Sequence, residues 1–223
     1  MQNVIAIPAN PALVNSTEDF LQAMDHGKPA AEKFITLVDR LTDRLLGLFL
    51  LEPAEMTDLS GGQRKVIDFA VSTASKASHM LTRQIYKKVS NEEFAPIAQS
   101  VRGMYWPAGE DNNQHPSLAF AVPDDFAADF RRAADVAEAG QGTSEVALIT
   151  AVMDRLTNEI IDRIFLENTR HVKIGFVTGK ALNVGVEGSR KAVHAVNNKV
   201  LKGLSDDELK GFMSHYSGIL TQR

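Results

Sequence analysis

The sequence predicts an all-α protein of about eight helices, arranged as a tandem duplication of a four-helix unit with pseudo-two-fold symmetry. Three observations support this fold class. The chain aligns with itself after a shift of 115 residues, apolar residues recur at helical spacing, and helix-capping motifs occur at equivalent positions of the two copies.

The self-alignment carries most of this prediction. Asp39-Arg40-Leu41-Thr42 falls on Asp154-Arg155-Leu156-Thr157, without a gap over most of each copy. Two copies are too few for a solenoid, which needs at least three stacked units. We therefore expect an intramolecular pseudo-dimer. Its parts are helical repeat 1 (residues 1–105), a linker (106–118) and helical repeat 2 (119–223).

The first two helices of each repeat are predicted from caps and apolar spacing. Ser16 and Thr17 offer an N-cap for a short helix that stops at Gly27. Pro29 suits the first turn of a second helix, which we expect to end before Pro53. The C-terminal half of this second helix is apolar on all sides, which indicates burial all round.

The third and fourth helices follow the same logic. The third helix is expected from Gly61 to Val89, with small residues on its apolar face that favour close packing against a neighbour. Ser90 and Glu93 form a capping box for the fourth helix, and Ser205 and Glu208 repeat it. The segments Val4–Pro8 and 118–123 are open to a short extended conformation.

Composition excludes several classes of protein. There are no cysteines, which excludes disulfides, thiolate nucleophiles and cysteine-ligated metals. The net charge of −4 argues against a dedicated nucleic-acid binder. The longest apolar run, Leu45–Leu51, is too short to span a bilayer, and the N-terminus lacks the features of a secretory signal. We expect a cytoplasmic protein without a membrane partner.

One short segment has a nucleotide-related resemblance. Leu59-Ser60-Gly61-Gly62-Gln63-Arg64-Lys65 resembles the signature sequence of ABC-type ATPases, in which the signature opens a helix facing a nucleotide phosphate. That fold also needs a phosphate loop. The nearest segment, Gly175–Ala181, has its glycines one residue too close and lacks the hydroxyl residue. We therefore interpret the segment as a glycine-rich helix start and expect no nucleotide and no cofactor.

Catalytic and metal-binding patterns do not emerge from the sequence. No Glu-x-x-His motif occurs, as a di-iron bundle would need, and no Gly-x-Ser-x-Gly motif occurs for a serine nucleophile. We predict no metal site and name no catalytic residue.

The candidate binding residues are polar residues that both copies retain. Lys65, Lys76 and Lys87 are matched by Lys180, Lys191 and Lys202. Their eleven-residue spacing is almost three full helical turns, so each set forms one stripe opposite the apolar face. Such a stripe is either a solvated surface or a binding surface for an anionic partner. His79 and His194 are also retained, and they either have a structural role or contact a ligand.

The function itself is not encoded in any motif. We expect a non-enzymatic helical interaction or regulatory protein that binds a protein partner or an anionic ligand. The alternative is an enzyme or small-molecule binder with a pocket between the two repeats. A cleft lined by His79, His194, Tyr105 and Trp106 would favour that alternative.

Overall fold

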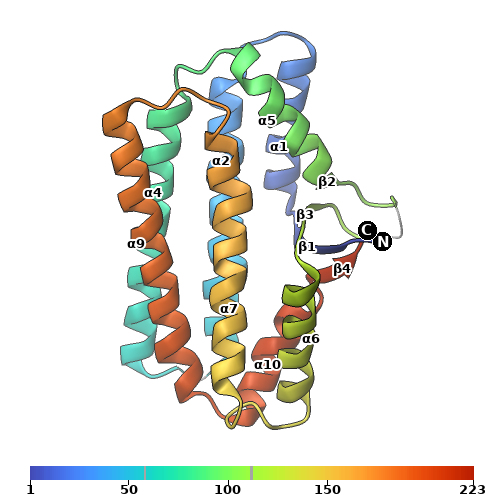
Figure 1. Cartoon of the computed structure of the whole chain (residues 1–223), viewed down its shortest axis with the longest axis vertical. Coiled ribbons are helices and arrows are strands. Elements are labelled where there is room, and N and C mark those ends of the chain that lie inside the picture. Colours follow the sequence, from blue (N-terminus) through green and yellow to red (C-terminus); the bar gives the residue numbers. More distant parts are fainter. Residues whose placement is uncertain (58, 111–112) are drawn as a thin grey trace.

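The computed structural model describes residues 1–57, 59–110 and 113–223. The chain is mostly helical, as the sequence predicts, and adds a small four-stranded antiparallel sheet at one side (Figure 1). The all-α prediction is therefore right in outline. The strands come from the two segments that were open to an extended conformation and from two short segments that were not.

The elements follow one another in two similar series. The first is β1 (Asn3–Pro8), α1 (Pro11–Asp25), α2 (Ala31–Leu46), the π-helical turn η1 (Gly47–Leu51), α3 (Glu52–Met56), α4 (Gly61–Tyr86), α5 (Asn91–Met104) and β2 (Tyr105–Trp106). The second is β3 (Ser117–Ala121), α6 (Asp124–Glu138), α7 (Val146–Ile160), the π-helical turn η2 (Ile161–Leu166), α8 (Glu167–Thr169), α9 (Phe176–Val200), the 3-10 turn η3 (Leu201–Gly203), α10 (Asp206–Ser217) and β4 (Leu220–Gln222).

Four long helices form the body of the molecule. α4 and α9 lie side by side and run in opposite directions, while α2 packs against α4 and α7 packs against α9 (Figure 1). The close approach of α4 and α9 depends on small residues, as the sequence predicts. A Cβ atom added to Gly185 would clash with Leu81, and one added to Gly203 would come within 2.8 Å of Gln63 Nε2.

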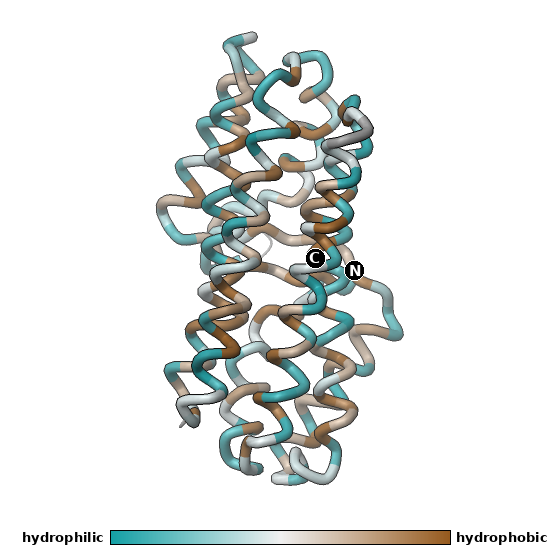
Figure 2. Tube along the Cα trace, turned by 90° about the vertical axis from the view of Figure 1, so that its left-hand side faces the viewer, coloured by the Kyte–Doolittle hydropathy of each residue, from teal (hydrophilic) through white to brown (hydrophobic). Residues whose placement is uncertain are grey.

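Four further helices cover the two ends of this body. α1 packs against α2 and α5 at one end, and α6 packs against α7 and α10 at the other (Figure 1). Along the long helices, hydrophobic and hydrophilic positions alternate in the way that amphipathic packing requires (Figure 2). Within the described ranges, no helix has both the length and the apolar character needed to cross a bilayer.

The sheet joins the first half of the chain to the second. Its strand order is β2-β3-β1-β4, and all its pairs are antiparallel. Ile5 pairs with Phe120 at the centre, and β4 extends the other edge of β1. Consequently β1 is hydrogen-bonded on both sides to strands from the second half.

The predicted start of the first helix is wrong. Asn10 is the N-cap of α1, because its side chain accepts a hydrogen bond from the Leu13 amide at 2.9 Å. Ser16 and Thr17 lie inside the helix, where both hydroxyls are buried and donate to Leu13 O. A hydroxyl bonded back to the preceding turn is as compatible with a helix interior as with a cap.

The predicted break at Pro53 is also wrong, because the chain stays helical to Met56. Pro53 has no N–H to donate to Leu48 O or Phe49 O, which lie five and four residues before it in this π-helical stretch. Leu48 O instead accepts from His215 Nε2 at 2.9 Å, and Phe49 O accepts from the Tyr216 hydroxyl at 3.0 Å. The wider π turn η1 accommodates the proline, and α10 supplies the missing donors.

The capping boxes are confirmed. Ser90 and Glu93 begin α5, and Ser205 and Glu208 begin α10, each with reciprocal side-chain and backbone hydrogen bonds. Ser60 and Gln63 form a third capping box at the start of α4. The Leu59–Lys65 segment is therefore a capped, glycine-rich helix start, as interpreted from the sequence. The third helix ends at Tyr86, slightly before the predicted Val89.

Candidate functional site

An apolar cavity lies between the four long helices. It has a volume of about 140 Å³ and is partly open to solvent. α4 and α9 touch through small residues such as Ala77 and Gly185, whereas α2 and α7 face each other across the cavity. Small residues hold α4 and α9 close together, and the cavity lies between this pair and the α2 and α7 pair.

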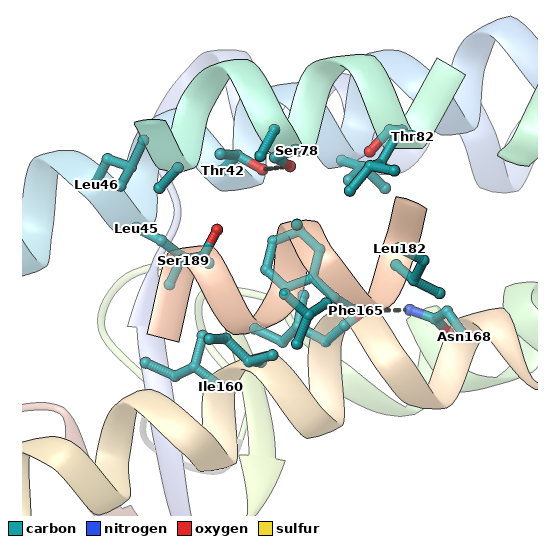
Figure 3. A pocket seen from close by; sticks show the side chains of 18 of the residues that line it. Thr42, Leu45, Leu46, Ser78, Thr82, Ile160, Phe165, Asn168, Leu182 and Ser189 are labelled. Atoms are coloured by element: carbon teal, nitrogen blue, oxygen red, sulfur yellow. Dashed lines mark hydrogen bonds between the residues drawn. The ribbon is translucent and has the colours of Figure 1, made fainter. Parts of the chain in front are cut away.

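Both π turns contribute to the cavity wall. η1 contributes Phe49 and Leu50, and η2 contributes Ile161, Ile164 and Phe165. In Figure 3 the Phe165 side chain projects toward the middle of the view, between the helix that carries Ile160 and the helix that carries Ser78. A π turn adds one residue to a helical turn, which rotates the side chains that follow, and such turns often occur at functional sites.

The lining carries hydroxyl and amide groups but no charged side chain among the described residues. Thr42 and Ser78 hydroxyls bond each other at 2.8 Å, and Asn168 Nδ2 donates to Ile164 O at 2.6 Å (Figure 3). Thr82 and Ser189 also reach the lining, and within the described part of the chain neither side chain has a hydrogen-bond partner. The site thus offers a few polar contacts within an apolar enclosure.

Two other hollows are less suited to a ligand. One, about 20 Å³ in volume, is lined by Phe49, Ile67 and Phe212 and has room for little more than one water molecule. The other, about 290 Å³, lies beside the sheet and contains Arg163 and Arg223. Arg163 is already paired with Glu167 at 2.8 Å, and Arg223 donates to Gly103 O and lies over the Trp106 ring.

No family model, curated protein or solved structure matches this chain. The site is therefore interpreted from its own geometry.

The six predicted lysines lie on the outer sides of α4 and α9 and of the turns that follow them, and all are exposed. None of them lines the cavity. Within the described residues, Lys65, Lys76, Lys87, Lys191 and Lys202 take part in no ion pair. Since α4 and α9 are adjacent, the two stripes share one side of the molecule.

His79 and His194 lie away from the cavity as well. His79 Nε2 is 3.5 Å from Asp43 Oδ1 and 3.9 Å from Asp39 Oδ1 on α2. Burial raises the pKa of the Asp39 carboxyl, while the nearby His79 opposes this shift. The Nε2 atoms of both histidines are buried and have no hydrogen-bond partner within the described residues.

The cleft that would have joined the histidines to the linker aromatics is not formed. The Tyr105 hydroxyl donates to Glu18 Oε1 at 3.0 Å, and Trp106 Nε1 donates to Glu110 O at 3.1 Å. Neither ring lines the cavity. Across the described ranges, no group of three or more histidine, aspartate or glutamate side chains is placed to hold a metal ion.

Sequence reasoning named none of the cavity residues as a site. The available signal was the apolar character of the second helix on all sides, which predicted burial of Leu46 and Leu50. Both residues line the cavity. A helix that is apolar all round is compatible with a filled core and with a hollow one, so this signal did not distinguish the two.

Proposed function

We propose that this chain is a non-enzymatic binding protein whose cavity between α2, α4, α7 and α9 holds a small, uncharged, mostly apolar molecule. The observation that carries the proposal is a concave, mostly apolar lining without a charged side chain among the described residues. Ligand sites are typically concave and apolar, with a few polar groups that fix the orientation of the ligand. A charged ligand would lose its hydration here without gaining a partner.

The size of the cavity limits the ligand. At about 140 Å³ it is close to the roughly 150 Å³ of an engineered apolar cavity in another protein that binds benzene. The expected ligand is therefore one aromatic ring or a short aliphatic chain. Thr82 and Ser189 offer hydroxyls to a single polar substituent on it.

We further propose that the chain is a tandem duplication with an approximate two-fold axis, divided at residues 106–118. The π turns η1 and η2, the capping boxes at Ser90 and Ser205, and the pairing of Ile5 with Phe120 all occur at positions about 115 residues apart. The cavity departs from this symmetry. The hollow lined by the residues 115 positions away, such as Ile67 for Leu182 and Val196 for Leu81, has a volume of only about 20 Å³. One ligand per chain is therefore expected.

Two ligands that differ in charge test the proposal directly. Benzyl alcohol and benzoate share a ring, so thermal unfolding at roughly millimolar concentrations of each isolates the effect of charge. Benzyl alcohol should raise the unfolding midpoint, and benzoate should not. Calorimetric titration should give one benzyl alcohol per chain.

Cavity-filling variants locate the bound ring. Ala74→Leu with Ser189→Leu places bulk in the cavity from α4 and α9 and should abolish the shift. The matched control is Ser72→Leu with Ala195→Leu, the same replacements at exposed positions of the same helices. Equal shifts with benzoate, or an unchanged shift in the cavity-filled variant, would show that the cavity does not bind the ligand.

A further inference from the structure

The exposed side of α4 and α9, here called the outer face, concentrates positive charge in a protein whose net charge is −4. α4 and the residue after it contribute Lys65, Lys76, Arg83 and Lys87, all exposed. α9 and the turn after it contribute Lys180, Lys191, Lys199 and Lys202, also exposed. The outer face is therefore basic, while the acidic residues of the chain are mostly elsewhere.

Few acidic groups offset this charge. Glu187 is exposed on the same side of α9, and its carboxylate is paired with Arg190 at 3.1 Å. Asp68 is exposed one residue before Phe69, toward the edge of the face. Arg83 is 3.7 Å from Glu32 at the border with α2. Within the part of the chain that the structure describes, Lys76 and Lys191 at mid-face take part in no ion pair.

The antiparallel contact of the two helices places the lysines in rows. The close approaches of Gly185 to Leu81 and of Gly203 to Gln63 fix the register. In that register Lys76 lies about level with Lys191, and Lys65 with Lys202. The rows repeat every eleven residues, so the face extends about 33 Å along the helices.

Large apolar side chains occupy the same face. Phe69 is 67% exposed, Met80 is 55% exposed and Val184 is 75% exposed. Phe69 and Met80 each follow a lysine of the stripe, Lys65 and Lys76, by four residues, or one helical turn. Figure 2 views the molecule from this side, where hydrophilic and hydrophobic positions alternate along the front helices.

We propose that the outer face docks flat on an anionic membrane surface. The lysines would contact lipid phosphates and carboxylates, while Phe69, Met80 and Val184 would insert between headgroups, which is how basic and apolar side chains combine at a bilayer interface. Lysine stems lie along the apolar boundary with their ammonium groups in the headgroup layer. This site is separate from the cavity, and it departs from the expectation, drawn from the sequence, of no membrane partner.

The composition of the face favours lipid over other anionic partners. Protein interfaces are depleted in lysine at their centre and gather their apolar residues into a core, whereas Lys76 and Lys191 lie mid-face and the apolar residues are interspersed. A nucleic acid would gain from the lysines but not from three exposed apolar side chains. A second copy would bring like charges together.

Vesicle sedimentation tests this docking with the full chain. The probe is phosphatidylcholine vesicles with about 30% phosphatidylserine, compared with pure phosphatidylcholine at low and physiological salt. The wild type should bind only the anionic vesicles, more weakly as salt rises. Lys76→Glu with Lys191→Glu should weaken binding at least about tenfold, and Phe69→Ser by about threefold or more.

A matched pair of charge reversals is the control. Lys28→Glu with Arg132→Glu makes the same total charge change at exposed residues outside α4 and α9, and should change binding less than about twofold. Circular dichroism checks that each variant folds. Amide hydrogen exchange of the wild type, which needs no variant, should slow in α4 and α9 when anionic vesicles are added.

Several outcomes would overturn the proposal. One is no binding to anionic vesicles at low salt. Another is binding that both charge-reversal pairs weaken equally. A third is binding to polyglutamate that is tighter than binding to anionic vesicles and is unchanged by Phe69→Ser. That result would indicate that the outer face binds an acidic protein. Binding to duplex DNA that is tighter than binding to anionic vesicles and is unchanged by Phe69→Ser would indicate that the outer face binds nucleic acid.

Discussion

The hydrogen bond between Tyr216 and Phe49 O offers a sharp test of the π turn. Tyr216 is fully buried, and its hydroxyl donates at 3.0 Å to Phe49 O, a carbonyl to which Pro53 cannot donate. Burial raises the pKa of Tyr216, so the hydroxyl stays protonated. Tyr216→Phe removes the donor to this part-buried carbonyl and should lower the free energy of unfolding by about 0.5–1.5 kcal/mol.

A double-mutant cycle separates this cause from general packing. Pro53→Ala restores an N–H that can bond Phe49 O in the helix, so Tyr216→Phe should cost about half as much or less in that background. Urea unfolding, followed by circular dichroism, measures all four proteins. Tyr86→Phe is the control, because the hydroxyl of this buried tyrosine has no described partner and its removal should cost little. If Tyr216→Phe costs the same in the wild type and in the Pro53→Ala background, the proline does not create the need for the tyrosine.

Three further outcomes follow from the geometry. Burial raises the pKa of the Asp39 carboxyl above its ordinary 3.8, so the ionised carboxylate destabilises the folded state at neutral pH. Asp39→Asn should therefore raise the thermal unfolding midpoint at neutral pH. This gain should be lost below about pH 4, where the carboxyl of the wild type is protonated in both states. Ser90→Ala and Ser205→Ala should each lower the free energy of unfolding by about 1 kcal/mol in urea titrations, and unequal losses above twofold would contradict equivalent caps. Gly185→Val should cost about 1–3 kcal/mol in the same titration, because its side chain meets Leu81; no loss would mean that α4 and α9 are not in close contact.

Features fixed by neighbouring residues were predictable from the sequence. The capping boxes at Ser90 and Ser205 depend on residues three positions apart, and both occur as predicted. The exposure of the lysine stripes follows from their helical spacing in the same way. By contrast, the helical path through Pro53 depends on Tyr216, which is 167 residues from Phe49, so no local pattern reports it.

The candidate cavity was beyond local reasoning for a similar reason. The sequence predicted burial of Leu46 and Leu50, and Leu50 is buried while Leu46 is half-buried, but it did not indicate whether the space between α2 and α7 is filled. The cavity forms only where α2 and α7 meet α4 and α9, and the contact between α4 and α9 joins Gly185 and Leu81 from different halves of the chain. The outer face likewise becomes one surface only when α4 and α9 lie side by side.

The shared sheet has a consequence for how the molecule can be divided. Since β1 is paired with β3 on one edge and with β4 on the other, a fragment of residues 1–110 would expose both edges of β1, and a fragment of residues 113–223 would lack the strand that bridges its own two. Unpaired edges seek a partner strand. The two fragments, expressed separately and mixed, are therefore expected to recombine into one complex, because β1 of the first fragment completes the sheet between β3 and β4 of the second. A chain divided at this point would then act as a split reporter for the association of its two fragments.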